Sequence, residues 1–160
     1  MSKKLGAVSA LVGAGVLLSG MQAHAAQSVP TGGGYSVYCA SNITLRSNGT
    51  LSTCTLGSNQ TVRTGQGQWL TLASGTPVAV TDTGDLIHGT LAGDQYVTSG
   101  SDSRYCASGF GVSLWYGGAL LSCTLRGTQT FYAAGLPFPC RSGFPVYVSS
   151  SGVLNNVCVI

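Results

Sequence analysis

A glycine recurs at a nearly constant spacing along this chain, and the residues around it recur with it. The four glycines are 35, 34 and 34 residues apart, and a leucine follows two positions after each one. Such a period indicates that one supersecondary unit was duplicated and stacked on its neighbours. The glycines are Gly49, Gly84, Gly118 and Gly152, the leucines are Leu51, Leu86, Leu120 and Leu154, and three copies also keep a glutamine, Gln60, Gln95 or Gln129.

The segments before the glycines alternate in polarity, and this period of two is typical of β-strands. Each glycine then closes a short polar turn, where a tight hairpin needs positive φ; we expect a type I turn with a glycine bulge. The prediction is an all-β fold of eight to twelve strands, in which four tandem β-hairpin repeats of about 34 residues form one antiparallel sheet, sandwich or barrel, stapled by disulfides. The alternating segments are 43–45, 78–80, 112–114 and 146–148, with further short strands near 61–63, 69–72, 96–98 and 131–132.

The first 25 residues have the pattern of a secretory signal peptide, in a short Gly/Ala-rich form typical of Gram-negative bacteria. Lys3 and Lys4 precede an apolar run that ends in the small-x-small site at 23–25. We therefore expect a periplasmic or extracellular protein that has no stable membrane insertion after cleavage. Within the exported part, we also expect a polar loop at 99–103. The predicted division is a signal peptide at 1–25, a leader segment at 26–38 and one β-repeat domain at 39–160, with copies at 39–71, 72–105, 106–139 and 140–160.

The charge of the predicted mature chain is close to zero. Two of the seven basic residues are the lysines of the signal, which leaves five arginines against four aspartates and no glutamate. Scattered arginines do not form the basic face that nucleic acids or anionic membranes require. We expect no nucleic-acid partner, while the low charge makes self-association a possible outcome.

All six cysteines follow the predicted cleavage site, so disulfides formed in an oxidising compartment are expected. No C-x-x-C spacing indicates a metal site. Three copies hold two cysteines each, while the second copy has Leu72 and Gly89 at the corresponding positions. Loss of both together is expected when the two cysteines pair within a copy, although Cys158 is displaced by one position relative to its counterparts. The predicted pairs are Cys39–Cys54, Cys106–Cys123 and Cys140–Cys158.

The unit at 112–125, V-x-L followed by a glycine turn and L-x-S-C-T-L, resembles bacterial secreted MORN-like hairpin repeats. It has a longer period and lacks the Tyr-x-Gly signature of ordinary MORN units. The resemblance implies an extended or curved antiparallel sheet with a scaffold or binding role, and no catalytic residues.

A second resemblance is to periplasmic inhibitors of C-type lysozyme. Ser99-Gly100 followed by Tyr105 is similar to a motif of those small β-barrels, although the tyrosine comes two residues too late, and 115–118 is similar to their aromatic-glycine hairpin. Duplication explains the same residues, because the sequence at 105–108 repeats that at 38–41. A lysozyme-inhibitor-like function therefore stays an alternative.

The composition disfavours an enzyme. His88 is the one histidine after the predicted cleavage site, and its counterparts in the other copies are small or polar, so we expect it to face solvent. The four aspartates lie in turn or loop contexts, and no G-x-S-x-G motif is present. We predict no enzymatic activity and no cofactor.

Two large aromatic residues break the repeat in its third copy. Trp115 and Tyr116 occupy turn positions that are polar in the other copies, with Arg126 and Tyr132 as possible neighbours. Exposed aromatic side chains favour recognition of a protein or carbohydrate ligand. The alternative is that Trp115 covers the open end of the sheet and Tyr116 flanks the turn. We predict a secreted non-enzymatic binding or interaction module; the alternatives are a structural component of the envelope or extracellular matrix and the inhibitor-like protein.

Overall fold

The structure is a computed structural model that describes residues 25–100, 102–133, 136–150 and 158. Within these residues the chain is all-β and has no helix, which confirms the predicted fold class. Fourteen strands are present among the described residues rather than eight to twelve, because the short strands expected between the repeats are complete hairpins. The strands are β1 Gln27–Pro30, β2 Ser36–Leu45, β3 Leu51–Leu56, β4 Gln60–Arg63, β5 Trp69–Leu72, β6 Pro77–Val80, β7 Leu86–Thr90, β8 Gln95–Ser99, β9 Asp102–Cys106, β10 Gly111–Leu114, β11 Leu120–Thr124, β12 Gln129–Ala133, β13 Leu136–Cys140 and β14 Pro145–Tyr147.

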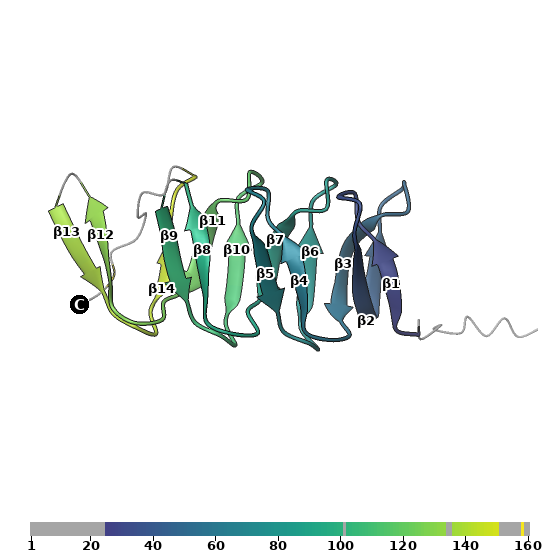
Figure 1. Ribbon diagram of the computed structural model, residues 1–160, viewed down its shortest axis with the longest axis horizontal. Coiled ribbons are helices and arrows are strands. Elements are labelled where there is room, and N and C mark those ends of the chain that lie inside the picture. Colours follow the sequence, from purple (N-terminus) through teal and green to yellow (C-terminus); the bar gives the residue numbers. More distant parts are fainter. Residues whose placement is uncertain (1–24, 101, 134–135, 151–157, 159–160) are drawn as a thin grey trace, which may run out of the picture.

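Eight of these strands form one antiparallel sheet, here called the long sheet, in the order β1-β2-β3-β6-β7-β10-β11-β14. The remaining strands pair two by two as the separate hairpins β4-β5, β8-β9 and β12-β13. Figure 1 shows that both sets follow the sequence along the long axis of the molecule, from β1 at one end to β13 at the other. The chain therefore builds the molecule by alternating one hairpin of the long sheet with one separate hairpin.

The strand β2 belongs to the long sheet, and its first part also forms a hairpin that lies in line with the separate hairpins. Its first residues pair with β1 and its last residues pair with β3. The pairing of Cys39 with Leu56 recurs as the bridges Leu72 to Leu91 and Cys106 to Leu125, where a separate hairpin meets the long sheet. The hairpin formed by β1 and residues 36–39 thus takes the place of the separate hairpins in the first unit. We call these four hairpins together the hairpin layer.

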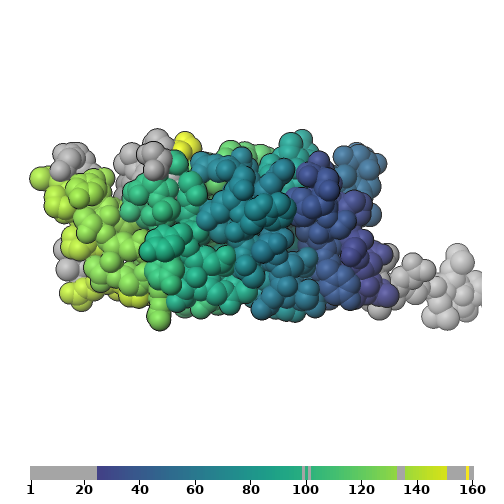
Figure 2. Space-filling model, in the orientation of Figure 1, coloured from purple at the N-terminus to yellow at the C-terminus, as the bar shows by residue number. Residues whose placement is uncertain are grey.

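One apolar core runs between the hairpin layer and the long sheet. Val62 and Val97 face it from the hairpin layer, and Val78 and Val112 face it from the long sheet. Burial of each such side chain contributes about 1.5–3 kcal/mol, so this continuous core provides the main stabilisation of the fold. Figure 2 shows the result as one elongated body with the units in sequence order.

The repeated glycines close the turns of the long sheet as expected. Gly49, Gly84 and Gly118 have φ values of 80°, 82° and 80°, which favour glycine. In each turn the glycine N–H donates to the carbonyl of the residue three positions earlier, as in a type I turn. The alternating segments before the turns lie in β2, β6 and β10, with 146–147 in β14, which confirms their prediction as strands.

The three disulfides are Cys39–Cys54, Cys106–Cys123 and Cys140–Cys158, as predicted. Cys106 lies on β9 of the hairpin layer and Cys123 on β11 of the long sheet, so this disulfide connects the two layers. Three disulfides are consistent with an oxidising, exported environment.

In the second copy a leucine side chain occupies the space of the missing disulfide. A Cβ placed on Gly89 would lie 2.7 Å from Cδ1 and 3.1 Å from Cδ2 of Leu72. Leu72 is fully buried, so the larger side chain on β5 is accommodated by the missing side chain on β7. Leu72 and Gly89, which replace the two cysteines in this copy, therefore form a packing contact in place of a disulfide bond.

Two segments differ from their sequence-based description. The expected leader 26–38 contains β1, which pairs with β2, because its valines contribute to the core. The expected polar loop 99–103 connects β8 and β9 and overlaps both strands. The predicted signal peptide falls on residues outside those described, except for Ala25, and so does most of the last turn, so the number of copies stays a prediction.

Candidate functional site

Glutamine side chains connect neighbouring members of the hairpin layer. Gln95 Nε2 donates to the carbonyl of Thr71 at 2.7 Å, and its Oε1 accepts from the Thr71 N–H at 2.8 Å. Gln60 makes the same two contacts with Tyr38, and Gln129 makes them with Tyr105. A side-chain amide thus takes the place of a backbone strand partner, which explains why this glutamine recurs with the repeat.

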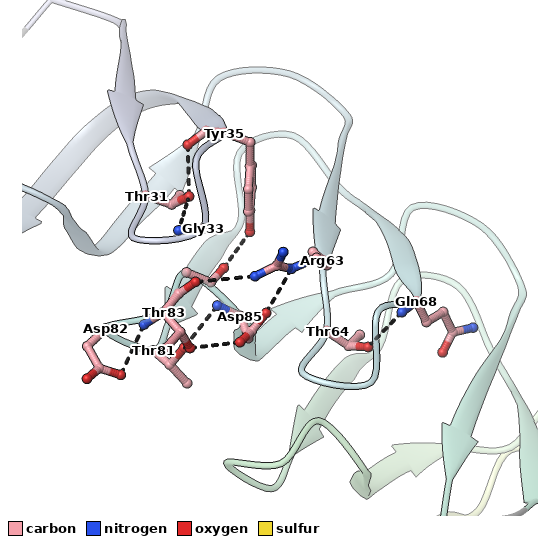
Figure 3. A network of polar contacts seen from close by, with 11 residues as sticks. Thr31, Gly33, Tyr35, Arg63, Thr64, Gln68, Thr81, Asp82, Thr83 and Asp85 are labelled. Carbon is pink, nitrogen blue, oxygen red and sulfur yellow. Dashed lines mark hydrogen bonds and ion pairs between the residues drawn. The ribbon is translucent and has the colours of Figure 1, made fainter.

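A polar network joins the first two hairpins of the hairpin layer to the turn at 81–84 of the long sheet (Figure 3). The Tyr35 hydroxyl donates to the Gly84 carbonyl at 2.5 Å. Arg63 Nε lies 3.0 Å from Asp85 Oδ1, and Thr83 Oγ1 donates to the other carboxylate oxygen at 2.7 Å. Three segments far apart in the sequence are therefore held in one arrangement.

This network also positions an exposed tryptophan. The ring of Tyr35 contacts Trp69 edge-on, with 5.2 Å between the ring centroids. Burial raises the pKa of Tyr35, which further favours the protonated hydroxyl that donates to Gly84. Trp69 begins β5 and has 50% of its surface exposed. Its ring contacts Tyr35 on one side, while half of its surface faces solvent.

The outward side of the hairpin layer carries a row of aromatic residues. Side chains alternate along a strand, so the residues between the buried ones face away from the core. Every hairpin of the layer contributes at least one aromatic side chain at such a position, and Tyr96 and Tyr105 stack with their centroids 4.7 Å apart. We call this surface the aromatic face; it consists of Tyr38, Trp69, Tyr96, Tyr105 and Tyr132.

The aromatic face carries little net charge. Arg63 is the charged residue among the outward positions of the described hairpins, and it pairs with Asp85. Arg104 points inward instead, where it pairs with Asp102 at 2.6 Å and lies 4.0 Å from the centroid of the Phe131 ring. The two arginines on the strands of these hairpins are therefore paired within the same chain.

The outward side of the long sheet is different. Register places Thr53, Ala79, His88, Ser113 and Ser122 side by side across five strands, so most of its central positions are small. The row continues to Tyr147 on the edge strand β14, where an exposed aromatic side chain lies. His88 is exposed, as predicted, and its Nδ1 lies 3.0 Å from Ser113 Oγ. The neighbouring positions in this row hold no carboxylate that would orient the imidazole, as a serine-histidine-aspartate triad requires.

The structure does not gather the four predicted binding residues into one site. Trp115 and Tyr116 lie in the turn before β11, whereas Arg126 follows that strand at its opposite end. Arg126 pairs there with Asp94 at 2.8 Å, and Tyr132 lies on β12 of the hairpin layer. A backbone hydrogen bond from Ser108, assisted by Arg126, lowers the pKa of Asp94. A binding role for these residues stays a prediction.

Trp115 has a structural contact that its counterpart in the first copy also makes. Its Nε1 donates to the carbonyl of Val148 at 3.0 Å. Arg46, at the same position of the repeat, donates through its guanidinium to the carbonyl of Val80, which corresponds to Val148. The indole therefore joins successive units, in line with the alternative that it covers the sheet. Tyr116, with 80% of its surface exposed, is the freer of the two.

Sequence comparison of the copies missed most of the aromatic face. Trp69 corresponds to Ser36 and Ser103, and Tyr96 corresponds to Thr61 and Thr130, so these aromatic residues do not recur at one position of the repeat. The sequence signal that could have found these residues was their alternation with buried side chains, as Tyr96 alternates with the buried Val97 on β8.

Within the described part of the chain, no cluster of three or more histidine, cysteine, aspartate or glutamate residues could hold a metal ion. No helix among the described residues is long and apolar enough to cross a membrane.

No family model, curated protein or solved structure matches the chain. The resemblances to MORN-like repeats and to lysozyme inhibitors therefore stay predictions. The fold and the aromatic face define a disulfide-bonded, two-layer β protein with two chemically different surfaces.

Proposed function

We propose that the protein is an exported, non-enzymatic binding module that acts in the periplasm or outside the cell. Its ligand contacts the aromatic face of the hairpin layer. The observation that carries this proposal is the contrast between the two outward surfaces: the hairpin layer presents aromatic side chains on every hairpin, whereas the central positions of the long sheet are mostly small.

Exposed aromatic residues support a binding role because they bring large contact areas and lose little conformational entropy on binding. Trp69, Tyr96 and Tyr132 have 50%, 62% and 66% of their surfaces exposed. Trp69 is already oriented by Tyr35, and Tyr96 by stacking on Tyr105. Preorganised rings bind at a lower entropic cost than mobile ones.

A binding assay tests the proposal: the purified mature protein is mixed with the surface fraction of the cells that export it, and the amount retained is measured. Trp69→Ala and Tyr132→Ser should each weaken retention about tenfold, since each removes one anchoring ring from the aromatic face. His88→Ala, on the outward side of the long sheet, is the matched control and should bind normally. Each variant is first checked for an unchanged melting temperature.

A fourth variant tests whether the ligand binds the aromatic face or the turn with Trp115 and Tyr116, which the sequence predicted as the binding site. Tyr116→Ser removes the most exposed aromatic side chain of that turn. Loss of retention in Tyr116→Ser with normal retention of Trp69→Ala and Tyr132→Ser would place binding at the turn and contradict the aromatic face.

A further inference from the structure

We infer that the aromatic face binds an extended chain of neutral sugars that runs along the long axis of the molecule. The inference rests on the proposed function, because it names the ligand class for the same surface. Three properties of the face support it: its lack of unpaired charge, its combination of rings with hydroxyl groups, and its linear repetition.

The charge pattern argues against an anionic ligand. Phosphate, sulfate or uronate groups are normally recognised by arginine or lysine side chains that are free to form charge-assisted hydrogen bonds. The guanidinium of Arg63 is already paired with Asp85, and that of Arg104 is buried against Phe131 and paired with Asp102. A neutral ligand fits a surface whose charges are compensated internally.

The side-chain chemistry fits sugar rings. One face of a pyranose presents C–H groups that stack on aromatic rings, while its hydroxyl groups exchange hydrogen bonds with neighbouring polar side chains. On the described hairpins the rings are interspersed with hydroxyl groups at outward positions, namely Ser36, Thr61, Thr71, Thr98, Ser103 and Thr130. Apolar rings beside a few polar groups are the usual composition of a small-ligand site.

The arrangement of the rings favours a polymer over a compact ligand. Tyr38, Trp69, Tyr96 and Tyr132 come from four successive hairpins, which follow one another along the long axis (Figure 1). A protein interface concentrates its anchors near its centre, whereas these rings lie in a row. A chain of repeated sugars can contact several hairpins at once, and each contact after the first is intramolecular and therefore favoured.

Calorimetric titration with defined oligosaccharides tests the inference. The probes are neutral β-1,4-linked glucose, β-1,4-linked mannose and α-1,4-linked glucose oligomers, from the disaccharide to the octasaccharide, and uronic-acid oligomers of the same lengths. At least one neutral series should bind, with affinity rising about tenfold or more from the disaccharide to the hexasaccharide. Trp69→Ala and Tyr132→Ser should each lower the hexasaccharide affinity about tenfold, and His88→Ala should leave it unchanged.

Failure of the sugar inference is distinguishable from failure of the proposed function. If no neutral oligosaccharide binds while both aromatic variants still lose retention on the cell-surface fraction, the sugar assignment is overturned and the binding face stands. Equal binding of uronic-acid oligomers, or affinity that is independent of length, would also overturn it. If the aromatic variants retain full binding in both assays, both proposals fail.

Discussion

At the scale of single residues, the recurring glutamine shows how a repeat position can be retained for a backbone contact. Gln60, Gln95 and Gln129 each bind both polar groups of a residue in the preceding hairpin. The separate hairpins have no backbone ladder between them in the described sheets, so these amides provide much of their lateral hydrogen bonding.

Replacing Gln95 with alanine should therefore lower the free energy of unfolding by about 1–3 kcal/mol, because its two hydrogen bonds with Thr71 and its longer one to the Gly93 carbonyl are lost. Urea denaturation followed by circular dichroism measures this change. Gln66→Ala, in an exposed turn, is the control and should change stability by less than about 0.5 kcal/mol. Equal stability of the two variants would show that the amide contacts do not hold the hairpins together.

At the scale of structural elements, the second unit shows that packing can replace a disulfide. Leu72 and Gly89 occupy the positions that two cysteines occupy in other copies, and the leucine fills the space above the glycine. At this point the hairpin layer and the long sheet are thus held together by apolar packing, whereas the other copies use a disulfide.

The double variant Leu72→Cys/Gly89→Cys should form a fourth disulfide within one copy. The loop it closes is similar in length to the native ones of 15 and 17 residues, and the chain-entropy model gives about 3 kcal/mol for such a loop. Thiol titration under denaturing conditions should find no free cysteine. Two free thiols in the folded, oxidised protein would contradict the equivalence of these positions.

The same elements explain how far the sequence could predict the fold. The turns of the long sheet were predictable because Gly49, Gly84 and Gly118 need positive φ, and the disulfides because their cysteines recur in pairs. The hairpin layer was only partly predicted, since its strands are short and its outward residues face solvent. Trp69 is free to differ from its counterparts because the core does not constrain it. Of the aromatic face, only Tyr38 and Tyr105 recur at one position of the repeat, so the repeat pattern could not mark the whole face.

At the scale of the whole molecule, the ends of the hairpin layer carry prolines. β1 and β13 are the strands at the two ends of this layer, and, like every strand of the separate hairpins, each pairs on one side only among the described residues. Pro30 lies on β1, and Pro137 and Pro139 lie on β13 opposite Tyr132 and Thr130. Proline has no N–H to offer to an added strand, and such residues protect edges from pairing with another molecule.

We therefore expect the mature protein to stay monomeric in sedimentation experiments up to about 100 μM, a concentration at which unprotected edges associate. The variant Pro137→Thr/Pro139→Thr restores two N–H groups and should form concentration-dependent oligomers. Polymers of the unchanged protein would instead favour the alternative of a structural matrix component.

The central claim is that the two outward surfaces differ in function and that the aromatic face is the one that binds. Hydroxyl-radical footprinting of the mature protein, free and bound to the cell-surface fraction, tests it directly because tryptophan and tyrosine side chains react readily. We predict that binding protects Trp69, Tyr96 and Tyr132 from modification, while Tyr116 and Tyr147, outside the hairpin layer, react as in the free protein. Protection confined to Tyr116 or Tyr147, with the aromatic face still reactive, would contradict the claim.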